Sequence, residues 1–87
     1  MFDTPKVVIE LENMKQKVGE ALILWRVADG FEAYENDARR CTEVLGMKLE
    51  HGDGYEFVRF KAEELNIHLP RLVRNGVRVA IADKNEK

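Results

Sequence analysis

The sequence predicts an α/β fold: three helices packed with a mixed sheet of about four strands, in the order helix, strand, helix, strand, strand, helix, strand. Three segments carry apolar residues at every third or fourth position, which is the spacing of one helix face. Short apolar runs of strand length lie between them, and glycines follow the helical segments where helices commonly end. With 87 residues, the chain is expected to form a single domain over 1–87.

The first helix is expected to begin at Thr4-Pro5, where a capping residue precedes a proline, and to end at Gly19. Its apolar face consists of Val7, Leu11, Met14 and Val18. A continuous apolar run over 21–28 follows and predicts a buried strand. This run breaks at Asp29-Gly30 and gives way to an acidic, aromatic segment, where we expect the chain to turn.

The second helix is expected to have Asn36 as its N-cap, Asp37 in its first turn and Gly46 at its end. Its apolar positions are Tyr34, Ala38, Cys41, Val44 and Leu45. Residues 47–50 and 55–60 then read as two short strands. The Asp-Gly pair between them, within 51–54, is a strong hairpin signal.

The third helix is predicted from Leu69, Leu72 and Val73, with Gly76 as its stop. Pro70 fits this helix best if Asn66 is the N-cap, because proline is tolerated near the first turn, whereas a helix starting at Ala62 would have to kink. The alternating segment 77–82 predicts a closing strand, and 83–87 a frayed tail.

Several classes of function are excluded or disfavoured by composition. The N-terminus lacks a signal-peptide pattern and no apolar run approaches the length of a membrane span, so we expect a soluble, cytoplasmic protein without membrane partners. No serine is present and no phosphate-binding Gly-rich loop, which excludes a serine nucleophile and nucleotide hydrolysis by this chain. The single cysteine, Cys41, is expected to be a reduced core residue. We expect no catalytic residue, no cofactor and no enzyme.

Two groups of residues contain side chains of the types that bind metal ions. Four acids (Asp29, Glu32, Glu35 and Asp37) fall within nine residues, but acids around one turn are more typical of a solvated loop and helix start. His51 and His68 stand at no familiar zinc spacing from Cys41 and are expected to be surface residues. No metal site is therefore predicted.

Charge is distributed unevenly along a chain of net charge −2 and pI near 5.7. Residues 1–58 carry seven Lys/Arg against twelve Asp/Glu, and residues 59–87 carry seven against four. Phosphate binding depends on clustered Lys and Arg, so this chain lacks the electrostatic footprint of a self-sufficient DNA binder. Only the last third offers a basic face, with Arg59, Lys61, Arg71, Arg74 and Arg78, and the alternative interpretation is a solvated helix surface. Within it, the candidate phosphate contacts are Arg71, Arg74 and Arg78.

Three segments together resemble the N-terminal domain of the MutS family of DNA mismatch repair proteins. Residues 26–32 are similar to the family's Arg-Met-Gly-Asp-Phe-Tyr-Glu, and Asn36-Asp37-Ala38-Arg39-Arg40 to its Glu-Asp-Ala-Lys-x-Ala. Residues 69–83 are similar to Tyr-Leu-x-Lys-Leu-Val-x-x-Gly-Tyr-Arg-Val-Ala-Ile-Cys-Glu/Asp-Gln. The resemblance implies the family's α/β fold and a role in recognising mispaired bases, in which a phenylalanine wedges beside the mismatch and a glutamate two residues later bonds the displaced base.

The chain departs from the family at the wedge itself. In the ungapped alignment the phenylalanine falls on Gly30, the neighbouring tyrosine on Phe31, and the glutamate on Glu32. Glycine offers no ring for base stacking, which is worth about 1–3 kcal/mol. Phe31 is expected to pack into the core rather than replace it, and Gly30→Phe is expected to raise affinity for mismatched DNA.

Two functional hypotheses follow. The leading one is a non-enzymatic, mismatched-DNA-binding type module with a degenerate base-reading site, weak or non-selective alone, that binds double-stranded DNA at Gly30, Phe31 and Glu32. It would belong to a longer polypeptide or accompany a larger DNA-handling protein. The alternative is a protein-interaction or structural adaptor that kept the fold and lost DNA reading. Balanced charge gives no evident reason to self-associate, so we expect a monomer.

Overall fold

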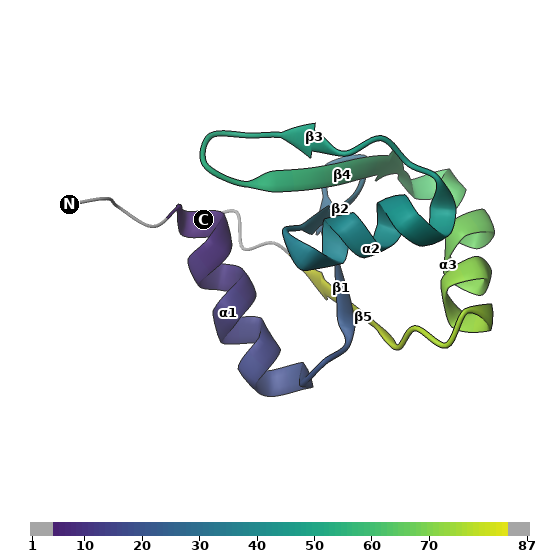
Figure 1. The fold of residues 1–87 in the computed structure, drawn as a ribbon, viewed down its shortest axis with the longest axis horizontal. Helices are drawn as coiled ribbons and strands as arrows, with labels where there is room; N and C mark the ends of the chain where they lie inside the picture. Colours follow the sequence, from purple (N-terminus) through teal and green to yellow (C-terminus); the bar gives the residue numbers. More distant parts are fainter. Residues whose placement is uncertain (1–4, 84–87) are drawn as a thin grey trace.

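The computed structural model describes residues 5–83 as an α/β arrangement around one mixed sheet (Figure 1). The helices of this part of the chain are α1 (Lys6–Val18), α2 (Asn36–Leu45) and α3 (Leu65–Arg74), the last preceded by a 3-10 turn, η1 (Ala62–Glu64). The strands are β1 (Leu22–Val27), β2 (Gly30–Tyr34), β3 (Glu50–His51), β4 (Glu56–Lys61) and β5 (Val79–Asp83). The predicted fold class is confirmed, with five strands in place of about four.

The sheet has the strand order β3-β4-β2-β1-β5. Strands β1 and β5 run parallel, and the other neighbours are antiparallel, so the sheet is mixed as predicted. The parallel pair needs a long crossover, and the whole segment from β2 to α3 supplies it. Two distant parts of the sequence, the first strand and the last, therefore lie side by side.

The strand that was not predicted is β2, because the sequence analysis took this acidic segment to be an irregular turn. It forms a hairpin with β1 in which Val27 is paired with Gly30, and every one of its residues is buried. The pattern of apolar residues does not reveal β2, because the charged Glu32 occupies its central position. A buried carboxylate is acceptable only when it is hydrogen-bonded, and here its partners come from elsewhere in the chain.

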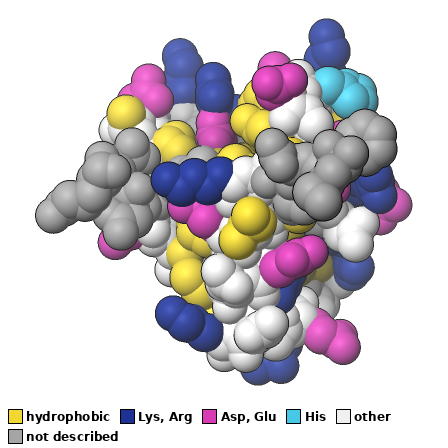
Figure 2. Space-filling view, turned by 90° about the vertical axis from the view of Figure 1, so that its left-hand side faces the viewer, with side chains coloured by type: hydrophobic (Ala, Val, Ile, Leu, Met, Phe, Trp, Pro, Cys, Tyr) yellow, Lys and Arg dark blue, Asp and Glu magenta, His cyan; other side chains and the backbone are white. Residues whose placement is uncertain are grey.

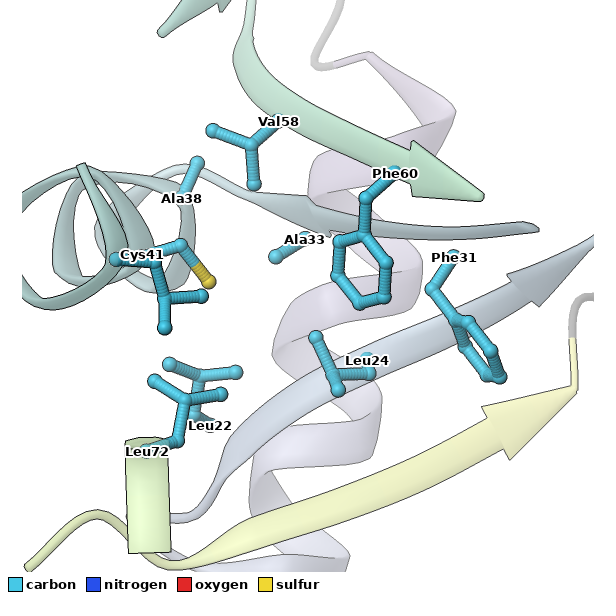
Figure 3. Packing of buried hydrophobic residues seen from close by; sticks show 10 residues of the cluster. Leu22, Leu24, Phe31, Ala33, Ala38, Cys41, Val58, Phe60 and Leu72 are labelled. Carbon is cyan, nitrogen blue, oxygen red and sulfur yellow. The ribbon is translucent and has the colours of Figure 1, made fainter. Parts of the chain in front are cut away.

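Helices cover both faces of the sheet. The cluster on the α2 and α3 side is built on Leu24, Phe31, Cys41, Phe60 and Leu72, whose side chains converge in Figure 3. The cluster on the α1 side contains Leu11, Ile23, Trp25, Tyr34 and Ala82. Of the predicted apolar faces, Leu11 in α1 and Ala38, Cys41 and Leu45 in α2 are buried, and Cys41 is a free thiol as expected. Tyr34, predicted on the apolar face of the second helix, lies instead in β2 and belongs to the cluster on the α1 side. The prediction for Val73 was wrong, since its side chain is 58% exposed.

Helix boundaries differ slightly from those predicted. Asn36 is the first residue of α2 rather than its N-cap, a position held by Glu35, while Gly46 ends the helix in the left-handed conformation as expected. Asn66 is likewise inside α3 rather than capping it. Pro70 is the sixth residue of α3 and lies inside the helix, not at the end of its first turn as predicted. The Asn66 carbonyl, which has no N–H donor at Pro70, belongs to an exposed residue and can bond to water.

The remaining differences concern segment ends. Residues 47–49 do not form a strand, because Met47 and Leu49 pack against the core cluster while pairing is limited to Glu50 and His51. Asp83, expected in a frayed tail, is the last residue of β5. The predicted cap Thr4 and the tail 84–87 lie outside the described residues. No helix in 5–83 has the length and apolar character required to cross a membrane.

Candidate nucleic-acid interface

The candidate site lies where the β1–β2 hairpin turns, beside the end of β4. Alternation along β2 places Gly30, Glu32 and Tyr34 on the face that α1 partly covers, and Phe31 and Ala33 on the opposite face. The turn is tied to the next strand, since the N–H of Ala62 donates to the Asp29 carbonyl at 3.1 Å. The hairpin therefore fixes residues 30 and 32, the predicted base-reading pair, on one face.

Gly30 occupies a place in which no larger residue fits. An ideal Cβ built there would lie 2.2 Å from the carbonyl oxygen of Phe60, a backbone atom of the adjacent strand β4. Its φ lies outside the left-handed region, so the requirement for glycine is steric rather than conformational. This changes the expectation for Gly30→Phe, because a ring at position 30 would first have to displace β4. Position 30 therefore has neither an aromatic ring nor the space for one.

Phe31 is a core residue, as expected from the sequence. Its side chain is 2% exposed and stacks on Phe60, with ring centroids 5.6 Å apart and planes inclined by 29° (Figure 3). The guanidinium of Arg26 covers the ring from outside at 5.3 Å. Phe31 cannot stack on a nucleobase without leaving the core.

Glu32 is buried and both of its carboxylate oxygens accept hydrogen bonds. Tyr34 donates its hydroxyl to Oε1 at 2.5 Å, and Arg59 donates through Nε to Oε2 at 2.7 Å and approaches the same oxygen with a terminal nitrogen at 2.5 Å. Hydrogen bonding to the carboxylate and its charge raise the pKa of Arg59. Burial, followed by the bond to Glu32, raises the pKa of Tyr34 far above its usual range. The predicted base-bonding carboxylate is engaged within the protein.

The acidic segment as a whole is not a solvated cluster, so that interpretation was wrong for its buried members. Asp37, 7% exposed, accepts the Ile23 N–H at 3.1 Å and binds the Lys15 ammonium at 2.9 Å. Glu35, at a positive φ of 56°, accepts the Glu56 N–H at 2.8 Å. These carboxylates hold strands and helices together, and within the described residues no three His, Cys, Asp or Glu side chains form a group that could hold a metal.

The structure divides the three predicted phosphate-binding arginines. Arg71 and Arg74 are exposed on the last turn of α3. Arg78 lines an open groove of about 790 Å³ whose other charged residues are Lys15, Glu20, Asp37, Arg39, Arg40 and Glu43. Both signs of charge line this groove, and Figure 2 likewise shows Lys/Arg and Asp/Glu side chains interspersed on the face it displays. No described surface gathers the arginines into a purely basic patch.

Arg59 and Lys61, which belong to the basic last third of the sequence, lie at the candidate site, a placement that the sequence analysis did not predict. Cα pairing sets Arg59 opposite Glu32, so both side chains stand on the same face, and Lys61 opposite Gly30 follows on that face. The alternation of Phe57, Arg59 and Lys61 along β4 indicates that they share one face. Nothing local in the sequence indicates which strand they would oppose.

The two histidines behave differently. His51 is exposed as expected, with its side chain 71% accessible. The prediction for His68 was wrong, since its side chain is 15% exposed, its ring packs edge-on against Phe60 at 4.8 Å, and Nε2 lies 3.4 Å from Glu64. It is part of the packing between α3 and β4.

Comparison of this chain with known proteins shows which family it is similar to. The sequence model described as MutS domain I matches residues 8–87. The chain is 41% identical over 78 residues to the DNA mismatch repair protein MutS of Cytophaga hutchinsonii, covering 84% of this chain and 9% of that protein. It is 35% identical over 89 residues to MutS of Flavobacterium johnsoniae (97% of this chain, 10% of that protein) and 40% identical over 79 residues to MutS of Porphyromonas gingivalis (85% and 9%). The chain thus spans about a tenth of the length of these relatives.

Proposed function

This chain belongs to the MutS domain I family, and from that premise we propose that it is a non-enzymatic DNA-binding module that contacts duplex DNA without selecting mismatches. Domain I is the part of MutS that the family resemblance associates with mispaired bases, whereas the nucleotide-hydrolysing motif is absent from this sequence. The proposal keeps the association with DNA and removes base reading.

The single observation that carries the loss of selectivity is the closed face formed by Gly30 and Glu32. Selective binding by wedging needs an aromatic ring to stack on the loosened base and an acceptor free to bond it. At position 30 a Cβ would collide with the backbone of β4, and the Glu32 carboxylate already accepts bonds from Tyr34 and Arg59. A ring at position 30 would require β4 to move, and a bond from Glu32 to a base would compete with its bonds from Tyr34 and Arg59.

Binding to the backbone of DNA remains open to this face. Arg59, with its side chain 59% exposed, and the exposed Lys61 stand beside Gly30 and carry donors that phosphate oxygens accept. Arg71, Arg74 and Arg78 are further candidate phosphate contacts. Because the chain has a net charge of −2, such contacts should be weak alone, and we expect the module to act with a larger DNA-handling protein or as part of a longer polypeptide.

The proposal is tested by titrating the isotope-labelled chain with a matched duplex and following backbone amide shifts at several salt concentrations. We expect salt-sensitive shifts at Gly30, Arg59 and Lys61. Replacing Arg59 by Gln should lower the dependence of log K on log salt by about 0.9, the value for one phosphate contact. A loss of binding with no change in this slope would point to an altered fold.

The chain offers a matched control for Arg59. Arg26 is exposed to a similar extent (57%), is paired with the carboxylate of Asp83, and covers a phenylalanine ring at 5.3 Å where Arg59 does so at 5.5 Å. Register places Arg26 opposite Phe31, on the other face of the sheet. Arg26→Gln should therefore leave the salt slope unchanged. Equal effects of the two substitutions, or no shifts even at low salt, would contradict the proposal.

A further inference from the structure

The C-terminal end of α3 carries the one Asn-Gly pair of the sequence, Asn75-Gly76. Asparagine is thermolabile, because the backbone nitrogen of the next residue can attack its side-chain amide carbon. Most side chains at the next position hinder that attack, and glycine does not, because it has no Cβ. Every other asparagine of the sequence precedes a larger residue. Asn75 is therefore the asparagine most susceptible to this chemistry.

The surroundings of the pair are open to solvent. Asn75 and Gly76 are both exposed, and nothing lies within 4 Å of the position that a Cβ on Gly76 would take. Water therefore reaches both residues, so a reaction that consumes water is not limited by access.

Backbone hydrogen bonds hold the pair in a closed arrangement. Gly76 donates its N–H to the Val73 carbonyl at 3.0 Å, and Val77 donates its N–H to the Leu72 carbonyl at 3.0 Å. With Gly76 in the left-handed conformation, these two bonds form the Schellman motif that ends α3. The Gly76 nitrogen can attack a neighbouring carbon only after its own hydrogen bond has opened.

The Asn75 side chain is held by the same turn. Its Nδ2 donates to the Arg71 carbonyl at 2.7 Å, one helical turn earlier. The amide group must leave this carbonyl before its carbon can meet the Gly76 nitrogen. Both reacting groups are thus released by one event, the fraying of the last turn of α3, and helix ends are the parts of a fold that open most easily.

We propose that Asn75 is a site of spontaneous deamidation that is gated by fraying of the last turn of α3. Once the turn opens, the backbone nitrogen of Gly76 bonds to Cγ of Asn75, the Cγ–Nδ2 bond breaks, and ammonia leaves with the amide proton of Gly76. Water then hydrolyses the resulting succinimide at either carbonyl. One route leaves aspartate, and the other leaves isoaspartate, in which the main chain runs through the former side-chain carbonyl.

The product changes the charge at this end of the helix. Arg71 and Arg74 occupy the last turn, where cations interact favourably with the helix dipole. A carboxylate at position 75 opposes the dipole, and in the chain it lies between Arg74 and Arg78. This consequence rests on the proposed function: the new negative charge weakens three candidate phosphate contacts. The modification itself does not depend on DNA binding.

Peptide mass spectrometry of the whole chain, incubated at mildly alkaline pH and digested with trypsin after increasing times, detects the modification. The mass of peptide 75–78 should increase by the difference between a carboxyl and an amide group, with aspartate and isoaspartate forms separated by chromatography. Peptide 62–71 is the internal control, because Asn66 is exposed in the same helix but precedes Ile67. Asn75→Gln should abolish the increase, since glutamine would have to close a larger ring.

The gate is tested by comparing two rates. A synthetic peptide of residues 71–78 is too short to keep a helical turn, so it gives the rate without a gate. The native chain should react about tenfold to hundredfold more slowly, and this ratio should match the hydrogen-exchange protection of the Gly76 N–H within about threefold. A native rate equal to that of the peptide, or lower than this protection allows, would overturn the proposal. Equal modification of Asn66 would overturn it as well.

The consequence for DNA has a separate readout. Asn75→Asp reproduces one product and should lower the dependence of log K on log salt for a matched duplex by up to about 0.9, the value for one phosphate contact. Asn66→Asp adds the same charge near the start of α3 and should leave this slope unchanged. Equal slopes for the two variants would overturn the consequence for DNA, whereas the mass and exchange measurements decide the modification by themselves.

Discussion

Replacing Gly30 by alanine should destabilise the protein, although the same change in an ordinary strand position is neutral or favourable. The added Cβ would lie 2.2 Å from the Phe60 carbonyl oxygen, far below the 3.0 Å that real Cβ contacts essentially never undercut. The obstacle is backbone, so relief requires β4 to move away from β2. That movement strains the pairing of Gly30 with Lys61 and the stack of Phe31 on Phe60.

The size of the effect follows from these contacts. Overpacking costs about 1–3 kcal/mol and a weakened ladder hydrogen bond about 1 kcal/mol, against about 0.5–1 kcal/mol gained when glycine is removed from the unfolded chain. The net loss in free energy of unfolding is about 1–3.5 kcal/mol. For a domain of this size each kcal/mol lowers Tm by about 4–8 °C, so Tm should fall by roughly 4–28 °C. Urea denaturation followed by Trp25 fluorescence measures the loss directly.

A second glycine separates steric from conformational causes. Gly76 has a φ of +80° and nothing within 4 Å of an added Cβ, so its requirement is conformational. Asparagine tolerates this backbone region, and Gly76→Asn should cost much less than Gly76→Ala. Gly30→Asn should be at least as damaging as Gly30→Ala. If Gly30→Ala leaves the free energy of unfolding unchanged or raises it, the steric reasoning is refuted.

Three further changes test the contacts around the site. Glu32→Ala removes the charge-assisted hydrogen bonds that Tyr34 and Arg59 donate and should lower the free energy of unfolding by about 1.5–3 kcal/mol, measured by urea titration. An unchanged free energy of unfolding would contradict the role given to Glu32. Asp37→Ala leaves the buried Ile23 N–H without its acceptor and should lower the free energy of unfolding by about 1–3 kcal/mol. Asp53→Ala, in the exposed β3–β4 loop, is the control and should be nearly neutral in the same assay. Equal losses for the two variants would contradict the role given to Asp37. Burial raises the pKa of the Cys41 thiol to about 12, while an unfolded thiol titrates near 8.5. The folded state thus keeps a proton that the unfolded chain loses, so this contribution to stability is full below about pH 8.5 and declines as pH rises from there toward 12; thiol-reactive labelling at pH 8 should follow unfolding, and rapid labelling of the native protein would refute the burial.

The extent to which the sequence anticipated the fold depends on the range of the interactions involved. Helix α2 was predicted closely because its signals are local, with polar residues at its start and Gly46 in the left-handed conformation at its end. Strand β2 was missed because its acceptability depends on Arg59, which lies 27 positions away and neutralises Glu32 only after β4 has paired. Local pattern cannot reveal such a partner.

The same distinction applies to the candidate site. Alignment on the family motif singled out positions 30–32, which lie at the start of β2 beside its turn from β1, and Phe31 is in the core as expected. The steric closure over Gly30 was invisible, because it arises from the Phe60 carbonyl on another strand. The grouping of Arg71, Arg74 and Arg78 as one basic face also rested on proximity in sequence, whereas the groove collects Arg78 with Arg39 and Arg40 from α2.

The central claim is that the face of the sheet carrying Gly30 and Glu32 is closed to nucleobases. The most direct test is the ratio of dissociation constants for a matched duplex and for the same duplex with one mispair, measured by fluorescence anisotropy at low salt. The closed face predicts a ratio within about twofold of one. A preference of about tenfold or more for the mispaired duplex, equivalent to about 1.4 kcal/mol, would contradict it.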